Sequence, residues 1–314
     1  MNKSLLLFLL IVVLTAGAWF SWQKAGRKST LEKLDLNFGV SDTSSVDRIL
    51  IEPVSGLKAD LVRMKEGGWM VNDKFKVAPV LMDVLLSTIR NIEMLRPLAK
   101  NEAATAIEGM EKRGRKVSVF VNGSPYKVYQ LGDDAPGNKG TYIRLEDGDP
   151  YVAYLRGFNG FLSPRYDVDE NEWRDRLLFD CKPEQIESVK IQYRRMPSES
   201  IAISLAGRKI RLEGTERFDT AAAAGLLSSF QKIYVERYLP YFPAKKADSL
   251  LRAGSEWSLE LNAPENSSPE KIEFFITSDA DRSLAYIPQR KEWLTIQNRL
   301  LYPIMQRRTA LLMP

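Results

Sequence analysis

Histidine is absent from this chain of 314 residues, and cysteine occurs once, at position 181. Histidine is the commonest general base at neutral pH and the commonest protein ligand of zinc. Its absence excludes serine or cysteine catalysis that depends on a histidine. Cys181 cannot form an intramolecular disulfide, and it lies too far from the N-terminus to carry a lipoprotein anchor. Carboxylates, lysines and hydroxyls are therefore the catalytic options in this sequence.

The sequence also lacks the usual signatures of phosphate-binding and metal-binding loops. Residues 132–140 are rich in glycine, but no helix start follows them and they have no phosphate-loop spacing. Four carboxylates lie between Asp167 and Glu172, where calcium is an alternative to a solvated linker, yet the glycine of an EF-hand loop is missing. Asp279 and Asp281 are interpreted as part of a turn. No catalytic, cofactor-binding or metal-binding residue is predicted.

Charge of one sign is not concentrated anywhere in the chain. The 45 basic residues are interspersed with 40 acidic ones, which gives a net charge of +5. Nucleic-acid binding proteins usually gather their basic residues in a patch or stripe, so nucleic acid is not predicted as a partner. A mildly basic surface is the simpler interpretation, and it would also suit an anionic lipid surface.

The most pronounced local feature is an uncharged N-terminal stretch. Residues 5–22 would form about 27 Å of helix, close to the thickness of a bilayer core. We predict a transmembrane signal anchor over residues 1–23, in which the membrane contacts include Leu5, Phe8, Leu14, Trp19 and Trp22. Cleavage after Ala18, as in a signal peptide, is the alternative.

This anchor predicts a single-pass protein of the inner (cytoplasmic) membrane, with its folded lobes in the periplasm or outside the cell. The orientation is in conflict with the positive-inside rule, because Lys24, Arg27, Lys28 and Lys33 follow the span. Long domains can cross a membrane despite such flanking charge, so both orientations stay open. Residues 24–45 are mostly small and polar, and they predict a stalk.

Beyond the stalk, the sequence pattern occurs twice with an offset of 140 residues. The strand pattern from Val46 returns at Ile186, the helix start at Pro79 returns at Asp219, and the strand start at Val117 returns at Trp257. Such self-similarity indicates two copies of one structural unit. We predict a first α+β repeat lobe over residues 46–176 and a second over 177–314, each with antiparallel sheet and one main helix.

Turn chemistry and apolar spacing predict the elements of each copy. In the first, hairpins are expected at Gly67-Gly68 and Asn122-Gly123, and a helix runs from Pro79 through Ile92 to a stop at Pro97. In the second, Asp219 is expected to cap a helix that carries apolar residues as far as Tyr234.

Besides the order of these elements, four segments are informative: residues 172–180, residues 183–191, the Gly68-Trp69 turn and the strand at 140–144. Together they resemble the bacterial domain of unknown function 4340 family of single-span envelope proteins. Members are often encoded beside gliding-type ABC transporter subunits, so the resemblance implies a membrane protein partner of that kind. It implies no catalytic residues and no cofactor.

Two functional classes follow from these observations. The preferred one is a membrane-tethered envelope interaction module, an accessory component of an ABC-type transport system, that contacts lipid through its N-terminal span. The alternative is a carboxylate-dependent envelope hydrolase that acts on glycan, for which two carboxyl groups about 5 to 10 Å apart would suffice. Basic and aromatic residues mark a possible partner surface, with core packing as the alternative for the aromatic ones: Arg194, Arg195, Tyr238, Tyr241 and Phe242.

Overall fold

The computed structural model describes residues 38–137, 139–146, 148–207, 209–263 and 271–313. The predicted anchor at Leu5 to Trp22 lies outside these ranges. Within them, no helix combines the length and the apolar character needed to cross a bilayer. Phe38 and Val40 are buried at 1% and 2% exposure, and the Val40 amide donates to the Ile89 carbonyl at 3.0 Å. The end of the predicted stalk therefore belongs to the folded part, which starts before Val46.

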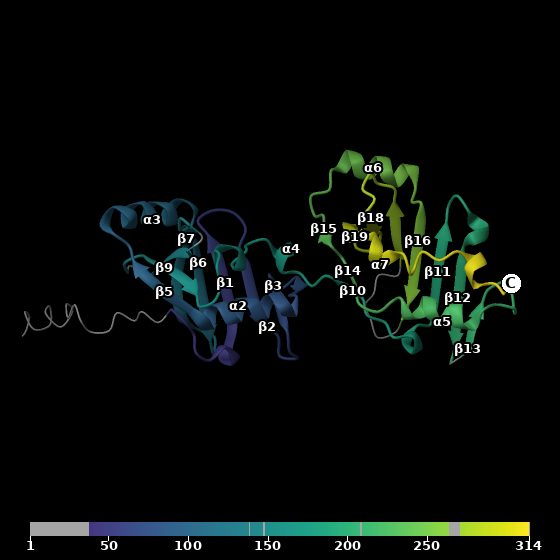
Figure 1. The fold of residues 1–314 in the computed structure, drawn as a ribbon, viewed down its shortest axis with the longest axis horizontal. Coiled ribbons are helices and arrows are strands. Elements are labelled where there is room, and N and C mark those ends of the chain that lie inside the picture. Colours follow the sequence, from purple (N-terminus) through teal and green to yellow (C-terminus); the bar gives the residue numbers. More distant parts are fainter. Residues whose placement is uncertain (1–37, 138, 147, 208, 264–270, 314) are drawn as a thin grey trace, which may run out of the picture. The chain divides into compact units, whose positions relative to one another are not determined.

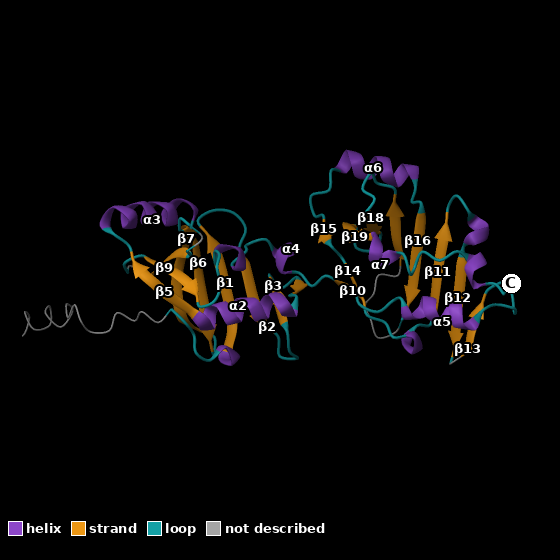
Figure 2. Cartoon of the chain, in the orientation of Figure 1, coloured by secondary structure: helices purple, strands orange, loops and turns teal. Residues whose placement is uncertain are grey.

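Two antiparallel sheets organise the chain, so the predicted α+β class with two sheet lobes is confirmed (Figures 1 and 2). The first sheet has the order β4-β3-β2-β1-β6-β7-β8-β9-β5. Its strands are β1 (Val46–Pro53), β2 (Ala59–Arg63), β3 (Trp69–Val71), β4 (Phe75–Lys76), β5 (Ile92–Pro97), β6 (Arg115–Val121), β7 (Ser124–Asp134), β8 (Thr141–Leu145) and β9 (Tyr151–Leu155).

The second sheet has the order β13-β12-β11-β16-β17-β18-β19-β15. Its strands are β11 (Ser188–Tyr193), β12 (Ile201–Ala206), β13 (Lys209–Leu212), β15 (Arg237–Tyr238), β16 (Trp257–Asn262), β17 (Lys271–Phe275), β18 (Arg282–Ile287) and β19 (Glu292–Gln297). A separate pair joins β10 (Leu177–Phe179) to β14 (Ile233–Tyr234). From β13 to β15, this order repeats the first sheet from β3 to β5, strand for strand.

The helices follow the same duplicated order. α2 (Pro79–Asn91) and α5 (Thr220–Ser228) each follow the opening strands of their copy, and α3 (Lys100–Arg113) and α6 (Ala244–Ala253) each precede its central strand. The remaining helices are short: α4 (Glu170–Trp173), α7 (Asn298–Leu301), η1 (Thr43–Ser45), η2 (Ser163–Arg165), η3 (Pro183–Gln185), η4 (Pro197–Glu199) and η5 (Arg308–Leu311). The expectation of one main helix in each copy is therefore wrong, because α3 and α6 were not predicted.

Both predicted helices are also shorter than expected. α2 ends at Asn91, and the residues from Ile92 to Pro97 form β5, whose partner is β9. α5 ends at Ser228, and Ile233 and Tyr234 form β14. Its start is as predicted, since the Asp219 carboxylate accepts from the amides of Ala221 and Ala222 at 2.8 and 3.0 Å. In both copies the apolar helical spacing extends beyond the last helical residue, but the residues that follow form strands.

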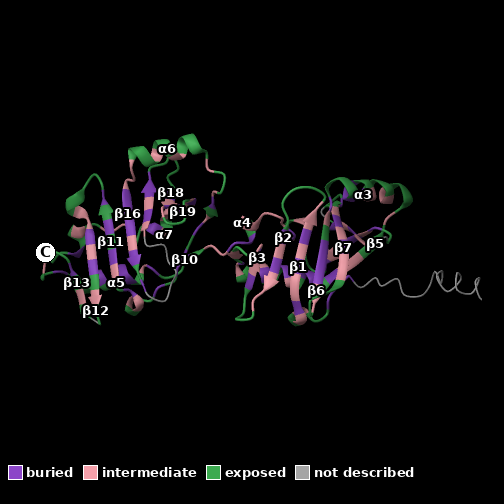
Figure 3. Cartoon of the chain, turned by 180° about the vertical axis from the view of Figure 1, so that it is seen from behind, coloured by how far each residue is buried: buried purple, intermediate pink, exposed green. Residues whose placement is uncertain are grey.

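The described residues form two compact units. The first comprises those of 38–58 together with 83–168, and the second those of 59–82 together with 169–313. Strands β2 to β4 and the first turn of α2 therefore group with the second unit. Each unit has its own buried core, drawn in purple in Figure 3.

Candidate functional site

In the second unit, helices lie on both faces of the sheet, but they cover the two faces to different extents. One face packs against α5 and forms the main core, which includes Ile191, Leu259 and Leu226. On the opposite face, α6 packs on a smaller cluster around Phe275, Leu284 and Trp293, from strands β17 to β19. The opposite face of β11, β12 and β13 lies outside both clusters. We call this region the open half-face.

Strand alternation gives the open half-face its chemistry. Along β11, Val189 and Ile191 are buried in the core, so Lys190 and Gln192 point to the other side and are exposed. Along β13, Lys209 and Arg211 are exposed in the same way, whereas Leu212 is buried. The open half-face is consequently polar and carries cations from two strands.

A groove of about 1030 Å³ runs over the open half-face and around β13. We call it the β13 groove. A second hollow adjoins it, because both are lined by Lys190, Ala202, Glu213 and Gly214. The β13 groove also has an apolar side, where Ile210 is partly exposed and the buried Leu212 and Phe218 contribute their rims. Cations beside an apolar edge suit an amphipathic ligand with negative charge.

Three cations of the β13 groove have no partner among the described residues. No side-chain hydrogen bond or ion pair joins Lys190, Lys209 or Arg211 to another residue of those ranges, although Glu260 lies opposite Lys190 in the strand register. A fourth cation, Arg308, lines the adjoining hollow and donates to the Glu213 carbonyl at 2.5 Å.

The carboxylates that line the β13 groove are those of Glu213 and Glu216, so cations outnumber acids in its wall. Exposed cations without a protein partner are available to an anionic ligand, because binding would not require an existing ion pair to break.

Several cations on the first sheet, in contrast, contact other side chains of that sheet and its loops. The Arg48 guanidinium carbon lies 5.0 Å from the centroid of the Phe120 ring. Lys116 lies 3.7 Å from the carboxylate of Glu146, and Arg144 donates to the side chain of Gln130 at 2.5 Å. The strand order is shared, but the first sheet already supplies contacts to its own cations.

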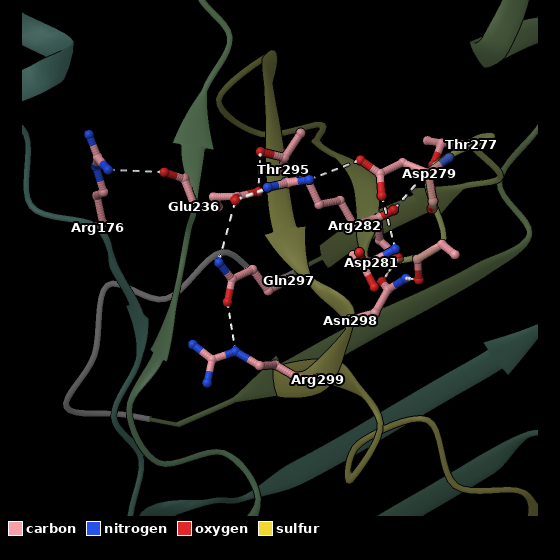
Figure 4. A network of polar contacts seen from close by, with 12 residues as sticks. Arg176, Glu236, Thr277, Asp279, Asp281, Arg282, Thr295, Gln297, Asn298 and Arg299 are labelled. Carbon is pink, nitrogen blue, oxygen red and sulfur yellow. Dashed lines mark hydrogen bonds and ion pairs between the residues drawn. The ribbon is translucent and has the colours of Figure 1, made fainter.

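A polar network elsewhere in the second unit fixes the ends of strands rather than forming a site. Figure 4 shows Arg282 between the carboxylates of Glu236 and Asp279, with Nε to Glu236 Oε2 at 2.7 Å. Hydrogen bonds from Arg282, and more weakly from Gln297 and Thr295, hold the pKa of the Glu236 carboxyl below its ordinary value of 4.5. Glu236 is therefore ionised at neutral pH, and its acceptors are occupied.

The second unit also contains a buried arginine with a full set of contacts. Arg174 makes two hydrogen bonds to the Glu292 carboxylate, at 2.7 and 2.9 Å. Its guanidinium carbon lies 3.5 Å from the ring centroid of Tyr238 and 4.1 Å from that of Phe75. Arginine stacks on aromatic rings and pairs with carboxylates in this bidentate way. The arrangement is a structural clamp, since the guanidinium has little surface left for a ligand.

The five residues predicted as a partner surface do not form one surface. Tyr238 is buried at 7% exposure beneath Arg174, so its inclusion was wrong. Phe242 stacks on Trp293 with centroids 4.4 Å apart, and Tyr241 is 80% exposed. Both precede the first residue of α6.

The two arginines of that prediction lie near the other end of α6. Arg194 donates to the Ala253 carbonyl, at the last residue of the helix, and Arg195 Nε lies 3.2 Å from the Glu256 carboxylate. The ten residues of α6 separate them from Tyr241 by about 15 Å of helix. The cations of the β13 groove were not singled out in the sequence, where strand-period alternation around residues 188–192 was the available signal.

The acidic cluster at residues 167–172 has structural roles. The Asp169 carboxylate caps α4 by accepting from the Asn171 amide at 2.9 Å. Glu170 accepts from Lys74 at 2.6 Å and from Asn72 at 2.9 Å. Within the described ranges, no cluster of three or more acidic or cysteine side chains has the geometry for a metal ion.

Carboxyl groups with a displaced pKa share one direction. Hydrogen bonds to the charged form lower the pKa of Glu93, Glu102, Glu199 and Asp279, as they do for Glu236. A carboxyl group that acts as a general acid needs a raised pKa instead. These groups are therefore ionised acceptors at neutral pH.

Comparison with known proteins gives one family. No curated protein and no solved structure gives a significant match to the chain. A family model, described as a domain of unknown function (DUF4340), matches residues 69–253, which is more than half of the chain and runs from β3 to the end of α6. With its duplicated strand order and its family-model match, the chain belongs to the DUF4340 family.

Proposed function

We propose that this protein is a membrane-tethered docking module of the cell envelope and an accessory component of an ABC-type transport system. Residues 5–22 anchor it in the inner membrane, and its two lobes face the periplasm or the cell exterior. The lobes bind a transporter subunit and do not act on a substrate. The genomic neighbourhood that the family resemblance implies supplies the kind of partner.

The observation that carries this proposal is the β13 groove. It combines exposed cations that lack a partner among the described residues with an apolar wall, on a sheet face that α5 and α6 leave open. Docking needs an accessible surface of defined charge, whereas hydrolysis of a glycan needs a carboxyl group that holds a proton near neutral pH. The exposed cations of the β13 groove meet the first of these requirements.

Crosslinked co-purification tests the proposal directly. The full-length chain is purified from native membranes after crosslinking, and its partners are identified by mass spectrometry. Charge reversal in the β13 groove by Lys209→Glu with Arg211→Glu is expected to remove transporter subunits from the eluate. The matched control reverses Arg90 and Lys245, which are exposed cations on α2 and α6. Recovery of the same partners with the groove variant, or of none with the wild type, would contradict docking.

The hydrolase alternative predicts the opposite pattern of effects. Glu213→Gln and Glu216→Gln change the carboxylates of the β13 groove without changing their size. Docking predicts that both variants retain transport-linked growth and co-purification. Loss of function in either variant, with normal folding and normal association, would favour the enzyme.

The anchor and its orientation are tested separately. Carbonate extraction is expected to leave the full chain in the membrane pellet, because an apolar helix of this length partitions strongly into lipid. Protease added to intact spheroplasts is expected to remove the lobes. Release into the supernatant would contradict the anchor, and full protection would contradict the orientation.

A further inference from the structure

The two sheets differ at the end that carries the third strand of each copy. In the first sheet, β3 pairs with β4 through Met70↔Lys76 and Val71↔Phe75. In the second sheet, β13 is the last strand in the order of the described residues. The chain after β13 makes one isolated bridge, Leu212↔Thr215, and then enters α5. The hairpin that extends the first sheet is thus cut short in the second.

The strand register determines which backbone groups of β13 face outward. The Glu213 amide donates to the Ala202 carbonyl of β12 at 2.9 Å, so Glu213 points its backbone groups into the sheet. Because these directions alternate along an antiparallel strand, Arg211 also points inward, whereas Ile210 and Leu212 point outward. The Leu212 carbonyl accepts from Thr215 at 3.4 Å. The amide and carbonyl of Ile210 therefore face the edge that lies along the β13 groove.

Side chains at this edge alternate in chemistry. Lys209 and Arg211 lie on the open half-face, about 7 Å apart along the strand. Ile210 lies on the other side of β13 and packs against the core, and Phe218 continues that apolar wall of the groove. A strand placed beside β13 would present every second side chain to the cations and the others to the apolar wall.

We propose that the β13 groove binds an extended segment of a partner protein, in which acidic and apolar residues alternate, by adding it as a strand beside β13. Acidic side chains of that segment contact Lys209 and Arg211, and its apolar side chains contact Ile210 and the rim of the buried Phe218. Backbone hydrogen bonds to Ile210 set the register. This inference rests on the proposed docking function and names the chemistry of the partner segment.

Charge complementarity and the apolar wall together select this occupant. An anionic glycan or phosphate would satisfy the cations, but it would leave the partly exposed Ile210 in contact with polar groups. A lipid surface is flat, whereas this groove follows the sheet around its edge. The first sheet provides the geometric precedent, because β4 occupies the corresponding position beside β3.

The test uses the full-length chain in detergent and a fluorescein-labelled peptide in which glutamate alternates with valine. Binding is followed by fluorescence anisotropy. A second peptide has the same composition but groups its glutamates at one end, and a third carries backbone N-methyl groups on its valines. The alternating peptide is expected to bind at least tenfold more tightly than either, because only it offers both the side-chain alternation and the backbone donors.

Variants of the protein locate the binding. Lys209→Glu with Arg211→Glu is expected to weaken binding of the alternating peptide at least tenfold. The control, Arg90→Glu with Lys245→Glu, is expected to leave its affinity unchanged. Circular dichroism establishes that all variants are folded. Equal affinity for the three peptides, or an equal loss in the control, would overturn the inference. Tighter binding to anionic lipid vesicles or to polyanionic glycan than to the alternating peptide would also overturn it.

The result is separable from that of the proposed function. If co-purification depends on Lys209 and Arg211 but the alternating peptide does not bind, docking stands and the segment chemistry is wrong. If the alternating peptide binds at the groove while no transporter subunit co-purifies, the groove chemistry stands and the transport role is wrong.

Discussion

The two sheets share their strand order but differ in how the third strand of each copy is covered. β3 is paired with β4, and the Lys76 carbonyl of β4 accepts from the Asp175 amide at 2.7 Å. Other segments of the chain therefore cover that end of the first sheet. β13 has a single bridge to Thr215, and its cations have no partner among the described residues. The two sheets thus share their strand order but differ at this end, which is where the proposed docking site lies.

A similar contrast holds for the helices that cover part of each sheet. α3 approaches β7 closely, because a Cβ atom at Gly132 would lie 2.8 Å from Met110 Cγ. α6 instead packs on an aromatic cluster in which the Trp293 ring lies 4.4 Å from Phe242 and 5.1 Å from Phe275. Trp293→Ala should therefore destabilise the second unit by about 3 to 5 kcal/mol, the largest effect expected here.

Thermal unfolding followed by far-ultraviolet circular dichroism measures this effect without relying on tryptophan fluorescence. Tyr126→Ala removes an aromatic side chain of the first sheet that is 58% exposed, and it serves as the control. A change within about 0.5 kcal/mol is expected there. Equal destabilisation by both variants would show that α6 does not depend on the aromatic cluster.

The closed edge can be opened by removing the arginine clamp. Arg174→Ala should cost about 3 kcal/mol, since it leaves the Glu292 carboxylate, 23% exposed, without its bidentate partner and removes the contact to Phe75. The rate of amide hydrogen exchange in β3 and β4 should rise in this variant. Arg176→Ala, which removes a pair with exposed Glu172, is the control and should have a smaller effect. Unchanged exchange in β4 would contradict the role given to Arg174.

Helix starts differ between the copies as well. α2 begins with Pro79, whereas α5 relies on the side chain of Asp219. Asp219→Ala should therefore destabilise the second unit by about 1 kcal/mol. Asp219→Asn keeps an acceptor oxygen and should restore most of that loss. Urea unfolding distinguishes the two variants, and an equally large loss in Asp219→Asn would mean that the negative charge rather than the cap is responsible.

The smallest expected effect concerns acid stability. Arg282 lowers the pKa of Glu236 in the folded state. The contribution of the ionised Glu236 to folding stability is therefore fully present above the ordinary pKa of 4.5, and it is lost as the pH falls through the lowered pKa. Glu236→Gln should therefore be less stable than the wild type at neutral pH, and the difference should shrink as the pH falls below 4.5. A difference that stays constant from neutral pH to pH 3 would contradict the ionic origin.

Much of the fold follows from local sequence signals. Gly67 and Gly68 have φ of +95° and +80°, and the Asn122-Gly123 turn has φ of +52° and +74°, so turn chemistry alone predicts these hairpins. Ile92 misled the helix prediction, because its apolar spacing continues α2 while pairing with Leu155 draws it into β5. Long-range pairing overrides a local period here.

Other parts depend on packing that a single sequence does not reveal. α3 is rich in alanine and charged residues and buries Ala106, Gly109 and Met110, so its apolar stripe is narrow. α6 buries no residue fully. The β13 groove could not be predicted, because it depends on where a hairpin stops after Leu212. In the sequence alone, Lys209 and Arg211 look like the exposed residues of any strand, because nothing shows that their strand is the last one of its sheet.

Site-specific photocrosslinking tests the central claim most directly. A photoreactive amino acid replaces Lys209 in the β13 groove, or Lys245 on α6 as the control, in the full-length chain in native membranes. We expect a crosslink from position 209 to an extended acidic segment of a transporter subunit and none from position 245. Crosslinks to that subunit from position 245 but not from position 209 would contradict it.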